Sequence, residues 1–289
     1  MTTCLIIPAA GGSKRFAESG PPGEARGMNK VEASLGDRPV FIRAIECFKH
    51  RDDIGPIVLA VNPNGIDQFK FKYGDRLGFL GVKIVPGGTV ERWETVANAL
   101  KAAEFDGTHF AVHDAARPLA STKLVDRVFA AAERYAAVVP GMPVSNTLKR
   151  VAASAGTRAS EADMPNDRMD VILDGAGKMV VEAWPVVETV DRSDLYEIQT
   201  PQVFDADLLR RAYTALRDGQ GDGAKVTDDA SLIERLGEPV HIVEGETTNL
   251  KITRAGDLKL AQILVDATRE DQAAQLAKKR LFADDDDEL

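Results

Sequence analysis

The sequence predicts an α/β fold in which a mostly parallel sheet is flanked by helices and carries one protruding β-arm. Three observations support this prediction. Short apolar runs alternate with segments whose apolar residues have helical spacing. Glycine-rich or charged clusters follow three of the apolar runs, which is where ligands bind in such sheets. The alternation stops between about residues 144 and 190, which indicates an excursion from the sheet.

The strands expected in the first half are short apolar runs bounded by turn residues. The first run, residues 4–7, ends at Pro8 and is typical of a buried parallel strand. Similar runs follow at residues 57–61, 82–85, 110–112 and 137–139.

The helices expected between these strands have apolar residues three and four positions apart. Pro39 suits the first position of one helix, and Ser121 suits the N-cap of another that runs to about Tyr135. Two more helices are expected at residues 65–73 and 91–105. The stretch that leads to Asn29 is rich in glycine and proline, so we expect a mobile loop there.

The second half begins with the predicted β-arm, at about residues 144–190, which holds short β-like pieces at residues 171–173 and 179–181. The α/β alternation then resumes. We expect one domain over residues 1–270, with the arm inside it, and a C-terminal extension over residues 271–289 with an acidic tail. The later elements are helices at residues 206–217 and 228–236, a strand at 240–243, and a helix from about Asp257.

The composition argues against several classes of protein. Hydrophobic residues make up 44% of the 289-residue chain, so a full core can be buried. The net charge of −9 argues against unspecific binding to nucleic acid or to an anionic membrane. We see neither a membrane-spanning run nor a signal peptide, and expect a cytoplasmic protein. Cys4 and Cys47 have no metal-binding spacing, so we expect free thiols.

The turn after the first strand is the first candidate site. Its small residues, from Pro8 to Ser13, would let backbone N–H groups close around phosphate oxygens. Lys14, Arg15 and the later Lys30 add positive charge. The dinucleotide fingerprint and the Walker motif are both absent. From these residues alone, an ordinary turn with surface cations explains the pattern equally well.

The segment from His113 to Pro118 is the second candidate site. Asp114 follows a buried strand, and a carboxylate there is a good oxygen ligand for Mg²⁺. Arg117 has the planar fork that binds phosphate. The alternative is that Asp114 caps the following segment and pairs with Arg117, and the residues alone leave both interpretations open.

Lys251 is the third candidate, because it lies in what we predict to be an apolar strand. A buried ammonium needs an anionic partner. The alternative is a lysine on an edge strand whose side chain reaches solvent. Of the other polar clusters, the run from Thr227 to Asp229 is predicted to serve mainly as a helix N-cap.

Taken in order, these segments resemble one family, the 2-C-methyl-D-erythritol 4-phosphate cytidylyltransferases of the non-mevalonate isoprenoid pathway. The matches extend over nearly the whole chain, and their shared order is far more specific than any single one. They are Pro-Ala-Ala-Gly at 8–11 with Arg15, Lys30, Gly87-Gly88 with Arg92 and Thr95, Val-His-Asp-Ala-Ala-Arg-Pro at 112–118, Pro-Val-Ser-Asn-Thr-Leu-Lys-Arg at 143–150, Thr-Val-Asp-Arg-Ser at 189–193, Gln-Thr-Pro-Gln-Val-Phe at 199–204, Val-Thr-Asp-Asp-Ala at 226–230, and Asn-Leu-Lys-Ile-Thr at 249–253.

The resemblance implies a Rossmann-like nucleotidyltransferase fold and a reaction that transfers CMP from CTP to 2-C-methyl-D-erythritol 4-phosphate with Mg²⁺. It implies catalytic roles around the triphosphate for Arg15, Lys30 and Lys251, and a metal-binding role for Asp114. It also implies a homodimer with interlocking β-arms. The implied acceptor ligands are Arg117, Thr147, Lys149 and Arg192, the last reaching the partner's site. The implied nucleotide-binding residues are Pro8, Ala9, Ala10, Gly11, Gly12, Ser13, Gly87, Gly88, Thr95, Asp114 and Ala115.

The chain departs from the family pattern at several places. Ser13 stands where the family usually has a glycine, and Asn29 replaces the usual proline before the lysine. The loop between Arg15 and Lys30 and the arm are longer than usual, and Asn146 replaces the usual aspartate. Two alternatives therefore stay open: transfer to another polyol phosphate such as ribitol 5-phosphate, or a non-catalytic regulator that binds CTP. A nicotinamide oxidoreductase is disfavoured by the missing fingerprint.

Overall fold

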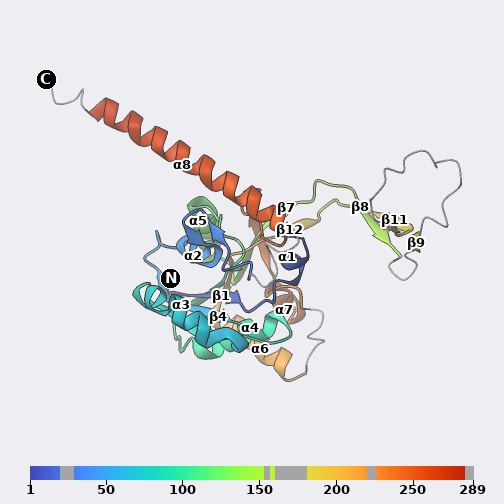
Figure 1. Ribbon diagram of the computed structural model, residues 1–289. Helices are drawn as coiled ribbons and strands as arrows, with labels where there is room; N and C mark the ends of the chain where they lie inside the picture. The colour runs from blue at the N-terminus through green and yellow to red at the C-terminus, as the bar shows by residue number, and fades with distance from the viewer. Residues whose placement is uncertain (20–28, 153–156, 160–180, 220–225, 284–289) are drawn as a thin grey trace, which may run out of the picture. The chain divides into compact units, whose positions relative to one another are not determined.

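The computed structural model describes residues 1–19, 29–152, 157–159, 181–219 and 226–283 (Figure 1). The chain divides into two compact units. The first combines Met1–Met142 with Ile198–Leu289, and the second is Pro143–Glu197. In the described part of the chain, no helix is both long and apolar enough to span a membrane.

The main sheet has eight strands in the order β12-β7-β13-β6-β1-β4-β5, with β14 paired to β7. Strand β1 is parallel to β4 and β6, β4 is parallel to β5, and β7 is parallel to β14. Strand β13 runs antiparallel to β6 and β7, so the prediction of a mostly parallel sheet is confirmed. The strands are β1 (Thr3–Ala9), β4 (Ile54–Val61), β5 (Val82–Pro86), β6 (His109–Val112), β7 (Ala137–Pro143), β12 (Tyr196–Ile198), β13 (Gln202–Asp205) and β14 (His241–Glu244).

The side chains of β1 explain why helices cover both faces of this sheet. Successive side chains of a strand point to opposite faces, so Leu5 and Ile7 join one buried cluster while Cys4 and Ile6 join another. Figure 1 shows α2 and α5 on one side of β1 and α6 on the other. The first cluster takes residues from α2 (Val40–Glu46), α3 (Ile66–Phe79) and α5 (Thr122–Ala132), and the second from α4 (Arg92–Ala102), α6 (Ala206–Arg217) and α7 (Ala230–Arg235).

A third buried cluster joins the first candidate turn to the last helix. The sequence predicts a loop up to Asn29, but helix α1 (Lys14–Ser19) forms at its start. The reason is that Phe16, only 2% exposed, packs in one cluster with Ala261 and Val265 of α8 (Ala255–Ala283). The hairpin of β2 (Ser34–Leu35) and β3 (Arg38–Pro39) also contributes to this cluster. Residues 20–28 lie outside the described residues.

The predicted boundaries of several elements need correction. Helix α3 continues to Phe79 after a 3₁₀ turn at Pro63–Gly65, so it is longer than predicted, and α4 ends at Ala102, earlier than predicted. Helix α8 begins at Ala255, close to the predicted start near Asp257. Cys4 and Cys47 are free thiols, as predicted, and burial raises the pKa of each to about 12.

The second unit contains two short antiparallel ribbons. Strand β8 (Leu148–Val151) pairs with β11 (Val186–Val190), and β9 (Thr157–Ala159) pairs with β10 (Val181–Ala183). Several of its apolar side chains are exposed, including Trp184, Val186 and Val187. The β-like piece predicted at residues 171–173, and most of the one at 179–181, lie outside the described residues.

Candidate active site

A cleft opens where β1, β5 and β6 reach their carboxyl ends. It is lined by residues 8–12, 88–92 and 114–116 from the three turns, together with Lys30, Val31, Thr95 and Lys251. The sequence predicts that the clusters after these strands meet at one edge of the sheet, and the structure confirms it. Among the residues predicted to bind the nucleotide or its triphosphate, Ser13, Arg15 and Gly87 do not line the cleft.

The turn after β1 leaves open space beside its glycines. A Cβ atom added to Gly11 or Gly12 would meet no atom within 4 Å, so packing inside the protein does not require glycine at either position. Both residues line the cleft and are exposed. The absence of side chains keeps this wall open to a ligand that approaches the backbone, as predicted for phosphate groups.

Gly87 and Gly88 are required by close contacts within the protein. A Cβ atom on Gly87 would stand 2.6 Å from the Cβ of Ala10, and one on Gly88 would stand 2.4 Å from the Cβ of Glu94. This close approach lets the backbone N–H of Gly88 donate to Oγ1 of Thr95 at 3.0 Å. In the structure, Thr95 therefore holds the turn that lines the cleft.

The start of α4 brings Arg92 to the cleft. Glu91 and Glu94 form a reciprocal capping box. The carboxylate of Glu94 accepts hydrogen bonds from the backbone N–H groups of Val90 and Glu91, at 3.0 and 3.2 Å. These bonds fix the loop after β5 up to the first residue of the helix, which is Arg92.

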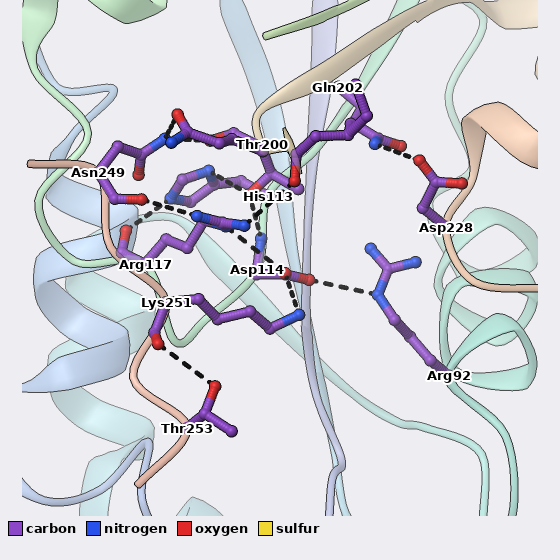
Figure 2. A network of polar contacts seen from close by, with 12 residues as sticks. Arg92, His113, Asp114, Arg117, Thr200, Gln202, Asp228, Asn249, Lys251 and Thr253 are labelled. Atoms are coloured by element: carbon purple, nitrogen blue, oxygen red, sulfur yellow. Dashed lines mark hydrogen bonds and ion pairs between the residues drawn. The ribbon is translucent and has the colours of Figure 1, made fainter. Parts of the chain in front are cut away.

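Asp114 is the centre of a charged network in the cleft (Figure 2). Nζ of Lys251 lies 2.7 Å from one carboxylate oxygen, and Nε of Arg92 lies 3.2 Å from the other. Nε of Arg117 is 3.9 Å away. Burial alone would raise the pKa of Asp114, but the charges of Arg92, Lys251 and Arg117 hold it well below its ordinary value. Asp114 is thus a permanent anion near neutral pH, unsuited to general acid–base catalysis.

The sequence leaves open whether Lys251 has an anionic partner or reaches solvent. In the structure it pairs with Asp114, and 40% of its side chain is exposed. The predicted strand around it is wrong, because residues 250–253 have no regular secondary structure. This segment is held instead by a hydrogen bond from the backbone N–H of Ile252 to the carbonyl of Ala116, at 2.8 Å. Ile252 is buried in the third cluster, which accounts for the apolar residues without a strand.

Arg92 and Asp229 extend the network into the core. Both lie in segments that resemble the family, but the sequence pattern gave neither of them a role in the site. Nη1 of Arg92 lies 2.8 Å from Asp229, whose side chain is fully buried. The hydroxyl of Tyr213 donates to the other oxygen of Asp229 at 2.5 Å. Burial would lower the pKa of Arg92, but the negative charges of Asp229 and Asp114 raise it.

The predicted N-cap role of Thr227 to Asp229 therefore needs a correction. Asp229 makes no capping hydrogen bond, whereas Oδ1 of Asp228 accepts from the backbone N–H of Ser231 at 3.1 Å. Because one cap needs only one acidic residue, the second aspartate was the available signal that this run has another partner. That partner, Arg92, is 137 positions away in the chain.

His113 is a buried, neutral support of Asp114. Its Nε2 lies 2.9 Å from the carbonyl of Arg117, which can only accept, so Nε2 carries the proton. Its Nδ1 then accepts from the hydroxyl of Thr200 at 3.1 Å, and that hydroxyl oxygen accepts from the backbone N–H of Asp114 at 3.1 Å. Burial lowers the pKa of His113 to about 4.

Lys30, which lies in the loop before β2, also lines the cleft. Burial lowers the pKa of Lys30, and the nearby charges of Lys251 and Arg15 add to the effect. Arg15 itself is exposed on α1 and does not line the cleft. Among the described residues, no ion pair involves the ammonium group of Lys30. The cleft is therefore lined by cationic groups that suit an anionic ligand.

A second hollow adjoins the cleft and shares Arg92, Asp114 and Lys251 with it. Arg117 lines this hollow and not the first, in keeping with its predicted assignment to the acceptor rather than to the nucleotide. Nη1 of Arg117 donates to the carbonyl of Asn249 at 2.7 Å. Figure 2 shows these side chains around Asp114.

The Gln-Thr-Pro-Gln segment at 199–202 holds the loops around this hollow together. Asn249 donates to Oε1 of Gln199 at 3.1 Å and to the carbonyl of Thr200 at 2.9 Å. Nε2 of Gln202 donates to Asp228 at 2.8 Å. The segment therefore links the loop before Lys251 to the loop before α7.

The other predicted acceptor ligands, Thr147, Lys149 and Arg192, belong to the second unit. There, Nζ of Lys149 donates to the hydroxyl of Thr189. Arg192 lies in an exposed turn, in which its carbonyl accepts from the backbone N–H of Leu195 at 3.1 Å.

The described residues contain no cluster of three or more histidine, cysteine or acidic side chains that could hold a metal ion by themselves. Asp114, with 10% of its side chain exposed, supplies a carboxylate to both hollows. Mg²⁺ usually binds one or two carboxylates and takes its other ligands from substrate phosphates and water. The donor set therefore fits an ion that arrives with a nucleotide.

The fold and the site together define a nucleotidyltransferase, in which a turn of small residues, an anion and several cations meet at the strand ends. The family model "IspD: 2-C-methyl-D-erythritol 4-phosphate cytidylyltransferase" matches residues 3–163 and 171–267. The chain belongs to this family.

Individual relatives agree with this assignment. The chain is 34% identical to a protein of Rhodopirellula baltica named 2-C-methyl-D-erythritol 4-phosphate cytidylyltransferase, over 92% of this chain and 96% of that protein. It is 33% identical to one of the same name from Dictyoglomus thermophilum, over 88% and 92%. The crystal structure of the Thermus thermophilus protein of that name is similar, with a TM-score of 0.60, 31% identity, and coverage of 91% of this chain and 98% of that one.

Proposed function

We propose that this enzyme transfers CMP from CTP to 2-C-methyl-D-erythritol 4-phosphate, giving 4-diphosphocytidyl-2-C-methyl-D-erythritol and pyrophosphate. Family membership supports the reaction, and so do the names of the relatives. The observation that carries the proposal is the position of Asp114 and Lys251, which line both hollows. A nucleotide in one hollow and an acceptor phosphate in the other would meet at these two residues.

In the proposed step, an oxygen of the acceptor phosphate attacks the α-phosphorus of CTP. The new P–O bond forms as the bond between the α-phosphorus and its bridging oxygen breaks, and pyrophosphate leaves with that electron pair. A phosphate nucleophile needs no general base, which agrees with the permanent anionic state of Asp114. Positioning and charge stabilisation therefore have to supply most of the rate enhancement.

The cations of the chain would supply that stabilisation. Lys30 and Lys251 would bind the triphosphate and offset the charge that develops on its oxygens, Arg15 would approach from α1, and Arg117 would bind the acceptor phosphate. The preformed network of Asp114, Arg92 and Asp229 would keep Lys251 oriented before substrate arrives. The roles proposed for Thr147, Lys149 and Arg192 rest on the family resemblance.

We also propose Mg²⁺ as the cofactor, with Asp114 as its ligand from the protein. When bound, Mg²⁺ would neutralise phosphate charge as a Lewis acid. The homodimer stays a proposal as well, supported by the exposed apolar side chains of Trp184, Val186 and Val187 on the second unit. The cytoplasmic location remains a prediction from the sequence.

Pyrophosphate release tests the function directly. The purified protein would be given Mg²⁺ and CTP with 2-C-methyl-D-erythritol 4-phosphate or, in parallel, with ribitol 5-phosphate. We expect release with the first acceptor only. Release with ribitol 5-phosphate only would keep the chemistry but overturn the substrate, and CTP binding without release for either acceptor would favour a regulator.

A further inference from the structure

Lys30 differs from the other cations of the cleft in how its position is maintained. Lys251 and Arg92 are held by carboxylates. The ammonium of Lys30 forms no ion pair with the described residues. Nearby charges act on it in both directions, since Lys251 and Arg15 repel it while Asp114 and Asp257 attract it. Its placement therefore depends on the backbone of residues 29–31.

That backbone is tied to Ser13 by a directed chain of hydrogen bonds. The N–H of Lys30 donates to Oγ of Ser13 at 3.1 Å, so this oxygen is an acceptor. The Ser13 hydroxyl in turn donates to Oδ1 of Asn29 at 3.0 Å, because a side-chain carbonyl oxygen only accepts. The N–H of Val31 lies 3.4 Å from the same Oδ1. Ser13 thus contacts Asn29 and Lys30 directly, and Asn29 in turn accepts from Val31.

Ser13 is itself firmly anchored on its other side. Its carbonyl accepts hydrogen bonds from the backbone N–H groups of Phe16 and Ala17, both at 3.0 Å. Phe16 is buried with residues of α8. At the far end of α1, Oγ of Ser19 accepts from the backbone N–H of Ala255, the first residue of α8, at 2.9 Å. Ser13, which accepts from the Lys30 N–H, is therefore anchored through α1 to the last helix.

The backbone of Ser13 has a conformation that glycine adopts more easily. Its φ is +54°, and a non-glycine residue in the left-handed region carries an energetic penalty. Glycine at this position would carry no such strain. The serine hydroxyl makes two hydrogen bonds that glycine cannot make, one to Asn29 and one from the Lys30 N–H. These two bonds offset the strain.

We propose that Ser13 and Asn29 form a hydrogen-bonded clasp that positions Lys30 in the cleft. The two residues contact one another across 16 positions of sequence and so join the two ends of the segment between them. Holding the two ends of this segment together costs conformational entropy, so the backbone of Lys30 would have more freedom without these hydrogen bonds. Ser13 and Asn29 are positioning residues. Their effect on catalysis rests on the proposed function.

A double-mutant cycle tests the coupling. Ser13→Ala and Asn29→Ala each remove one side of the clasp, and we expect each to lower kcat/KM for CTP about tenfold, the loss typical of one hydrogen bond. The double variant should also lose about tenfold, because both changes break the same contact. Thermal midpoints should stay near that of the wild type. Ser34→Ala removes an exposed hydroxyl outside the cleft and should leave kcat/KM unchanged.

Additive losses of about a hundredfold in the double variant, or wild-type activity in either single variant, would overturn the clasp. A loss of kcat/KM that merely follows a fall in thermal midpoint would also overturn it. That outcome would assign both residues to general stability.

Amide hydrogen exchange of Lys30, read by NMR, tests the clasp without any activity. In Ser13→Ala the Lys30 N–H loses its acceptor, so its exchange should be about tenfold faster than in the wild type, with no change in Ser34→Ala. Equal rates in the wild type and Ser13→Ala would overturn the clasp. If the wild type releases no pyrophosphate with either acceptor, the proposed function fails, while faster exchange would still support the clasp.

Discussion

Lys30 and Lys251 line the same cleft, but different forces hold them in place. Lys251 is paired with Asp114 at 2.7 Å, and Asp114 is tied through Arg92 to the fully buried Asp229. Lys30 is held by one neutral hydrogen bond, from its backbone N–H to Oγ of Ser13. The strand-end side of the cleft is therefore an ionic network rooted in the core, whereas the loop side depends on a few bonds near the surface. Function should be sensitive on both sides, and global stability on the ionic side alone.

The largest effect should come from removing either cation. We expect Lys251→Ala to lower kcat/KM about a thousandfold and Lys30→Ala about a hundredfold, both through loss of stabilisation in the transition state. Lys251→Ala should cost more because it also leaves the negative charge of Asp114 less compensated beside the triphosphate. Steady-state kinetics checks this, with Lys70→Ala, an exposed lysine on α3, as the matched control. Near-normal turnover in either variant would refute its assigned role.

The second effect separates the two sides by stability. Asp229→Asn removes a buried charge that faces Arg92, and we expect the free energy of unfolding to fall by about 3 kcal/mol, since one partner of a buried pair is left uncompensated. Asp126→Asn is the matched control. It also breaks an ion pair, with Arg51, but its side chain is 53% exposed, so the loss should stay below about 1 kcal/mol.

Urea denaturation measures both values. Equal losses in the two variants would mean that burial does not set the strength of this network. The Lys30 side offers no comparable stability test, because its contacts include no buried charge among the described residues.

The sequence could predict the strand-end side well, for physical reasons. A short apolar run followed by a polar cluster is a local pattern, and β1, β5 and β6 all have it. The parallel sheet then brings the ends of these runs to one edge. The meeting of Asp114 with the two glycine turns at one edge of the sheet could therefore be predicted from the sequence.

What the sequence could not predict depends on contacts between distant segments. Asp229 matches a helix N-cap, and its burial next to Arg92 identifies the partner that the sequence could not name. The apolar neighbours of Lys251 suggested a strand, yet Ile252 is buried against Phe16 and α8 rather than in a sheet. Likewise, α1 forms within a stretch rich in glycine and proline because Phe16 is buried in the same hydrophobic cluster. No local pattern encodes any of these three pairings.

A third effect concerns acid stability of the strand-end side. The pKa of His113 is about 4 in the folded protein, against about 6.5 in an unfolded chain. Between these values the unfolded state binds a proton that the native state does not, so stability falls as the pH drops from 6.5 toward 4. The expected loss between pH 7 and pH 5 is about 2 kcal/mol.

Urea denaturation at the two pH values measures this term. His113→Asn should lack it, so its stability should change less between pH 7 and pH 5, while His50→Asn, a change in a surface ion pair, should retain the full dependence. A variant of His113 with an unchanged pH response would show that another group causes the acid sensitivity.

The smallest effect is the pH dependence of kcat/KM that arises from Lys30. We expect no such dependence near neutral pH. Burial and the charge of Lys251 lower the pKa of Lys30, so Lys30 loses its charge at a lower pH than an ordinary lysine. Because the neutral amine no longer attracts triphosphate, kcat/KM should decline as the pH rises through this pKa. Lys30→Arg keeps its charge throughout, so its alkaline decline should move to higher pH. If the wild type and Lys30→Arg have the same pH profile, another group causes the alkaline decline. That result would contradict the proposal that Lys30 loses its charge at a lowered pKa.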